Sequence, residues 1–80
     1  MVYRGHIRDP ETLGRMLAEA RHLRGLTQRD LARELGVSQR YIWEMEAGAP
    51  TIATTRLFAA MAATGMSLVA EIEPPGAQHG

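Results

Sequence analysis

The chain contains no cysteine and no lysine. Without cysteine it can form neither disulfides nor thiolate metal sites, and this agrees with a reducing, cytoplasmic setting. All nine basic residues are arginines, whose planar guanidinium favours bidentate contacts over diffuse attraction. No apolar run approaches the ~18 residues of a membrane span, and the start MVYRGHIRDP lacks the apolar segment of a signal peptide. We therefore expect a soluble, cytoplasmic protein that does not enter a membrane.

Length and charge restrict the architecture further. Eighty residues make one small domain, which buries only ~60% of the surface of its unfolded chain. Nine acidic residues balance the nine arginines, so the formal net charge is zero. This balance argues against a non-specific basic tail, although it does not say how charge is distributed over the surface.

Signs of catalysis or metal binding are also missing. His6, His22 and His79 share no metal-ligand spacing, and no Ser-His-Asp set, glycine-rich phosphate loop or paired carboxylates in a pocket-forming context occur. Four short helices leave little room for a catalytic cleft. We therefore expect a protein that is not an enzyme and holds neither a metal nor a cofactor.

Four helical segments follow one another, each opened by a capping residue and closed by a glycine. The capping residues are Asp9, Thr27, Ser38 and Thr51, and the closing glycines are Gly25, Gly36, Gly48 and Gly65. Between them, apolar side chains recur at helical spacing. For the last helix this spacing predicts an inner face of Leu57, Ala60, Met61 and Thr64.

The two ends of the chain differ from this helical core. Residues 1–8 show no clear period and are interpreted as an N-terminal arm, ahead of a helical domain at 9–65. In residues 66–73, apolar side chains alternate with others, which predicts a strand. Its apolar positions are Met66, Leu68, Ala70 and Ile72. Pro74 and Pro75 end the strand, and residues 74–80 are expected to be a disordered tail.

A single strand needs a partner, because an isolated strand is not stable. Val2–Ile7 could supply one, but Gly5 and a weak alternation count against it. We therefore favour the same strand of a second copy, which would give a two-fold homodimer.

The two central helices and the glycine-containing turn between them predict a helix-turn-helix, whose second helix lies in the major groove of DNA. The stretch GLTQRDLARELGVSQRYIWEMEAG closely resembles the DNA-binding core of the Cro/cI-like (XRE) helix-turn-helix family. The resemblance implies an all-α fold: a compact four-helix, lambda-repressor-like domain with a short C-terminal strand that pairs across a dimer.

The flanks DPETLGRMLAEARHLRGLTQ and GAPTIATTRLFAAMAATGMSLVAEIE resemble the HipB-type antitoxins of bacterial toxin–antitoxin pairs. That resemblance implies a repressor that controls its own operon and also binds a kinase-like toxin.

Candidate DNA contacts gather around the third helix. In its first turn Gln39 is suited to adenine, and Arg40 to guanine or phosphate. Trp43 and Glu44 lie on the same helical stripe, although Trp43 could instead pack against the next helix. Candidate phosphate contacts are Gln28, which could also be merely exposed, Ser38 and Tyr41.

Glu46 falls on the buried side of the third helix and needs a cation if it is to stay charged. In phage repressors of the resembled family, an arginine of the first helix pairs with the glutamate at this motif position. The corresponding residue here is Arg21, so the resemblance implies a structural Arg21–Glu46 salt bridge.

These observations leave two classes of function. The first is a repressor that binds double-stranded DNA at a palindromic operator as a homodimer, with half-sites ~10 bp apart. The second is an interaction protein that restrains a partner enzyme, with DNA binding secondary. The HipB-type resemblance combines the two, and a stand-alone regulator without a toxin is the remaining alternative.

Overall fold

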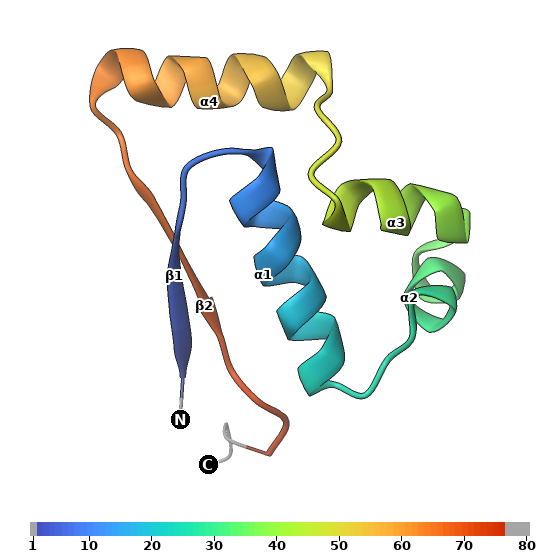
Figure 1. Ribbon diagram of the computed structural model, residues 1–80. Coiled ribbons are helices and arrows are strands. Elements are labelled where there is room, and N and C mark those ends of the chain that lie inside the picture. Colours follow the sequence, from blue (N-terminus) through green and yellow to red (C-terminus); the bar gives the residue numbers. More distant parts are fainter. Residues whose placement is uncertain (1, 77–80) are drawn as a thin grey trace.

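The computed structural model describes residues 2–76. Figure 1 shows four helices and a two-stranded sheet, with α1 between the sheet on one side and α2 and α3 on the other. In chain order the elements are β1 (Tyr3–Ile7), α1 (Pro10–Leu23), α2 (Gln28–Leu35), α3 (Gln39–Glu46), α4 (Ile52–Thr64) and β2 (Leu68–Ile72). No helix in residues 2–76 has the length and apolar character to cross a membrane.

Each helix begins after the capping residue that the sequence predicts. The side chains of Asp9, Thr27, Ser38 and Thr51 each accept a hydrogen bond from a backbone N–H in the first turn. At the other end, Gly36 stops α2 in the left-handed conformation, with φ 70°. Local capping chemistry therefore fixes where the helices begin and end.

The N-terminal segment, expected to be an arm, contains the strand β1. It pairs antiparallel with β2, so that Tyr3 lies opposite Ile72 and Ile7 lies opposite Leu68. Within the chain β2 thus has a partner strand, the alternative that the sequence made less favourable, and pairing of β2 with a second copy stays a prediction. Gly5 lies within β1, and a Cβ there would lie 3.0 Å from Met16 Sδ of α1. The glycine lets α1 pack closely against the strand.

The remaining end-of-chain predictions have mixed outcomes. Met66 precedes β2 and is half exposed, and Leu68 is 40% exposed, whereas Ala70 and Ile72 are partly buried. The chain turns at residues 75–76 after β2. The rest of the expected tail, residues 77–80, lies outside the described residues.

The core of the described chain is small. Its fully buried apolar residues are Ile7, Ala32, Ile42 and Met61, contributed by β1, α2, α3 and α4. α1 contacts three of these elements, β1, α3 and α4, and so connects the sheet to the helices. The position of α3 therefore depends mainly on its packing against α1 and α2.

The predicted inner face of α4 was largely wrong. Met61 is buried as expected, but Leu57 is 48% exposed, and Ala60 and Thr64 are exposed as well. The stripe that packs inward also contains Phe58, which is half-buried. α4 contacts α1, and within residues 2–76 the neighbouring apolar stripe of α4 is exposed.

Candidate nucleic-acid interface

α2 and α3 pack against one another across a tight turn. Gly36 and Val37 both donate backbone hydrogen bonds back into the last turn of α2, the second from Val37 N to Ala32 O at 3.0 Å. Ser38 then opens α3, its Oγ accepting from Tyr41 N at 3.0 Å. These bonds end α2 and begin α3 within three residues, so the connection between the two helices is short.

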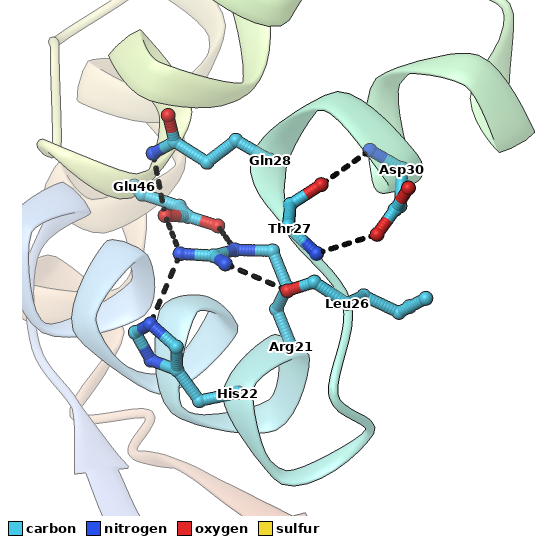
Figure 2. Close-up of polar contacts among 7 residues, drawn as sticks. All are labelled: Arg21, His22, Leu26, Thr27, Gln28, Asp30 and Glu46. Carbon is cyan, nitrogen blue, oxygen red and sulfur yellow. Dashed lines mark hydrogen bonds and ion pairs between the residues drawn. The ribbon is translucent and has the colours of Figure 1, made fainter.

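The inner side of α3 is held by a buried ion pair with α1. Arg21 Nε donates to Glu46 Oε2 at 2.6 Å, and Arg21 Nη2 donates to Glu46 Oε1 at 3.0 Å (Figure 2). Each side chain is only 8% exposed. Arg21 Nη1 also donates to the Leu26 carbonyl oxygen at 2.8 Å, just before α2. One guanidinium thus joins α1, the loop after it and α3.

The two charges stabilise one another. The hydrogen bond from Arg21 lowers the pKa of Glu46; burial acts against this shift, and a hydrogen bond from Gln28 adds to it. The same bond with Glu46 raises the pKa of Arg21. Both groups are therefore charged at neutral pH, and each supplies the counter-charge that the other needs when buried.

Gln28 is part of this anchor. Its amide nitrogen donates to Glu46 Oε1 at 3.0 Å, and its amide oxygen points away from the carboxylate in Figure 2. The carboxylate can only accept, so the amide must turn its NH2 group towards it. Gln28 is half-buried, unlike a freely exposed glutamine, and one of its two N–H hydrogens remains for another acceptor.

The outer side of α3 forms an open groove together with the start of α2. Gln28, Gln39, Arg40 and Trp43 line this groove, which has a volume of about 540 Å³. Trp43 is 58% exposed and so is not covered by the next helix. The structure thus brings four of the predicted DNA-contacting side chains onto one surface, which we call the reading surface.

The other three candidates, Ser38, Tyr41 and Glu44, do not line the reading surface. Glu44 is within 3.4 Å of Arg40 in an exposed ion pair one turn along α3. Tyr41 and Glu44 line a separate cleft between α1, α3 and the start of α4. Ser38 is exposed, and its Oγ is used as a cap acceptor but keeps its hydrogen for donation.

One residue that positions the site was not predicted from the sequence. Gly14 of α1 is buried, and a Cβ there would lie 2.4 Å from the carbonyl oxygen of Glu46 and 2.6 Å from that of Met45. The last turn of α3 therefore rests directly on the α1 backbone. A lone glycine inside a helical pattern is the signal that could have indicated this close approach.

Within residues 2–76, no group of three histidine, aspartate or glutamate side chains is placed to hold a metal ion. His6 lies on β1 and His22 near the end of α1, where its Nε2 is 3.4 Å from Arg21 Nη2. His79 lies outside the described residues. Among the described residues, the candidate functional side chains thus gather on the polar and aromatic surface around α3.

Comparison with known families agrees with this geometry. Residues 12–72, from α1 to β2, match the helix-turn-helix domain family. The chain belongs to that family. Its helix-turn-helix domain is of the XRE-like group and points to a DNA-binding regulator. Comparison with curated proteins and with solved structures gave no match.

Proposed function

We propose that this helix-turn-helix protein is a sequence-specific transcriptional repressor that binds a palindromic DNA operator as a dimer, without catalytic activity. The observation that carries the proposal is the reading surface, where side chains of α2 and α3 converge on one open groove. In this docking mode α3 lies in the major groove, with its N-terminal residues facing base edges.

Each candidate contact, on the reading surface and beside it, has a chemical role in this proposal. Gln39 can pair bidentately with adenine and Arg40 with guanine, while the exposed ring of Trp43 offers an apolar contact to a thymine methyl. Glu44 accepts from a cytosine amine and disfavours sites that present an acceptor there. Ser38 and Tyr41 donate to phosphate, as does the free amide hydrogen of Gln28.

The test combines two substitutions in the first turn of α3, Gln39→Ala and Arg40→Ala. A bidentate base contact is worth ~1–3 kcal/mol, so losing both should raise the dissociation constant roughly 30-fold or more. The operator is first isolated by selection from random-sequence DNA, and binding is measured by gel shift. Both side chains are exposed, so the circular dichroism spectrum and the oligomeric state should not change.

Arg4→Ala serves as the matched control for the loss of an arginine. Arg4 lies on β1, across α1 from α3, and its side chain is 70% exposed in a pair with Glu71. It should bind the operator like wild type. Wild-type affinity in the double variant would show that α3 does not read the DNA.

We further propose that the protein is the antitoxin of a toxin–antitoxin pair and binds a kinase-like toxin. The support is the resemblance of both flanks of the helix-turn-helix to HipB-type antitoxins. The test is to co-express the chain with the product of the adjacent gene. Growth arrest by that product alone, relieved by this chain and accompanied by co-purification, is the expected result. No arrest and no complex would leave a stand-alone regulator.

A further inference from the structure

α4 is more apolar than expected for a helix that packs against the rest of the chain on one face only. Its 13 residues, IATTRLFAAMAAT, include a single charged side chain, Arg56. Only Met61 is buried, and Thr54 and Phe58 are half-buried; the other ten residues are exposed. A helix at a protein surface normally carries polar and charged residues on its outer side, whereas one that is apolar nearly all round is buried.

The uncovered part of α4 includes a continuous stripe suited to helix packing. Ala53, Leu57, Ala60 and Thr64 are spaced by four, three and four residues, so they fall on one side of the helix. We call these four residues the second stripe. Leu57 is 48% exposed, and the small residues beside it would let another helix approach closely.

A hollow lies next to the second stripe. The cleft between α1, α3 and the start of α4 has a volume of about 540 Å³ and shares Ala53 with the stripe. Its walls include Leu13, Leu17 and Met45, and Glu44 is its only charged residue. A protruding apolar ridge and an apolar hollow therefore lie side by side on one surface.

The exposed area is consistent with a missing partner. The chain exposes 5813 Å², whereas a folded monomer of 8.8 kDa is expected to expose about 4800 Å². Full exposure of the five residues outside the described range would explain at most about half of the difference. The remaining ~500 Å² is close to the ~600 Å² that each partner buries in a small specific interface.

We infer that the second stripe and the α1 side of the adjoining cleft, lined by Pro10, Leu13 and Leu17, form the dimer interface with a second copy of this chain. The α3 side of the cleft, with Tyr41 and Glu44, lies outside this interface. In a two-fold interface the same patch is used twice, so a ridge beside a hollow can complement its own copy. The inference rests on the proposed function in that a palindromic operator requires two copies. It is an alternative to β2–β2 pairing, which would have to use the edge of β2 that β1 leaves unpaired.

The experiment is sedimentation equilibrium of the full chain in the absence of DNA, comparing wild type with Ala60→Glu and Leu57→Glu. A dimer of either variant would bury a new carboxylate from each copy, so its dissociation constant should rise by ~100-fold or more. Ala60 is exposed in the single chain, so circular dichroism should show an unchanged fold. Two variants guard against a folding defect in one.

Ala59→Glu is the matched control. Ala59 is also exposed, takes the same substitution and lies on the same helix, but it points ~100° away from Ala60 and outside the second stripe. It should remain dimeric. A monomeric wild type would overturn the inference. Ala60→Glu and Leu57→Glu that both remain dimeric would overturn it as well, and would point to the free edge of β2 as the contact. Because no DNA is present, this outcome is independent of the operator-binding test.

Discussion

At the scale of single residues, the Arg21–Glu46 pair is the contact whose loss should cost most. Both side chains are 8% exposed, so Glu46→Ala leaves the guanidinium of Arg21 buried without its counter-charge. We expect the free energy of unfolding to fall by ~3–5 kcal/mol, a large part of the stability of a domain of this size. Urea unfolding followed by circular dichroism measures the change.

The chain offers a matched control for this prediction. The Arg4–Glu71 pair has a comparable distance, 2.8 Å, but its side chains are 70% and 52% exposed. Since exposed pairs contribute little, Glu71→Ala should leave the urea midpoint close to that of wild type. Equal effects of the two substitutions would mean that burial does not determine the importance of the Arg21–Glu46 pair.

The same pair predicts how stability depends on pH. The hydrogen bond from Arg21 holds the pKa of Glu46 below its ordinary value of 4.5 in the folded state. Its ionised form therefore contributes stability that is present above pH 4.5 and lost as pH falls through the lowered pKa. Glu46→Gln has no such titration, so its deficit relative to wild type should shrink as the pH is lowered from neutrality.

That comparison must use the difference between the two proteins, because other groups titrate in the same range. Hydrogen bonds from Thr12 lower the pKa of Asp9, and those from Thr27 lower that of Asp30. Both carboxylates are present in wild type and variant alike, so their contributions cancel in the difference. A deficit that stays constant from neutral to acid pH would contradict the assignment to Glu46.

At the scale of helices and strands, the contact between α1 and α3 depends on Gly14. Inside a helix, Gly→Ala normally stabilises by ~1 kcal/mol. At position 14 the added methyl would lie within 2.6 Å of two carbonyl oxygens of α3, so Gly14→Ala should instead destabilise by ~1–3 kcal/mol. It should also weaken operator binding, since α3 must move. Arg15→Ala, at the exposed neighbouring position, is the control for both measurements.

A helix or strand could be predicted where residues close in sequence determine it. Capping side chains act within one turn, so the starts of all four helices could be predicted from Asp9, Thr27, Ser38 and Thr51. β1 could not, because Gly5 looks unfavourable until Met16 of α1 is seen to occupy the space beside it. Long-range packing decides such positions.

The candidate site was likewise predictable in part. The motif placed Gln28, Gln39, Arg40 and Trp43 near one another, and the structure gathers them on one groove. It gave no sign that the Gln28 amide is engaged by Glu46, because that bond joins residues 18 apart in sequence. For α4, periodicity detected an apolar stripe correctly but assigned it to the interior of one chain.

At the scale of the whole molecule, the described chain is open and flat, with dimensions of 38 × 32 × 16 Å. α4 lies across the beginning of α1 and leaves its second stripe uncovered (Figure 1). A domain normally buries each apolar face against another layer. Within residues 2–76, α4 thus keeps an uncovered apolar face, which the proposed second copy would cover.

A fixed dimer also fixes the distance between the two reading surfaces, and this gives the last prediction. If both copies of α3 bind the same face of the DNA, half-sites must lie about one helical turn, ~10 bp, apart. Inserting about five base pairs between them turns one half-site to the opposite face, so wild type and Ala59→Glu should lose the contribution of one copy. Ala60→Glu, already monomeric, should bind both spacings equally. If gel shifts instead show the same loss for Ala60→Glu as for wild type, the two half-sites are not linked through α4.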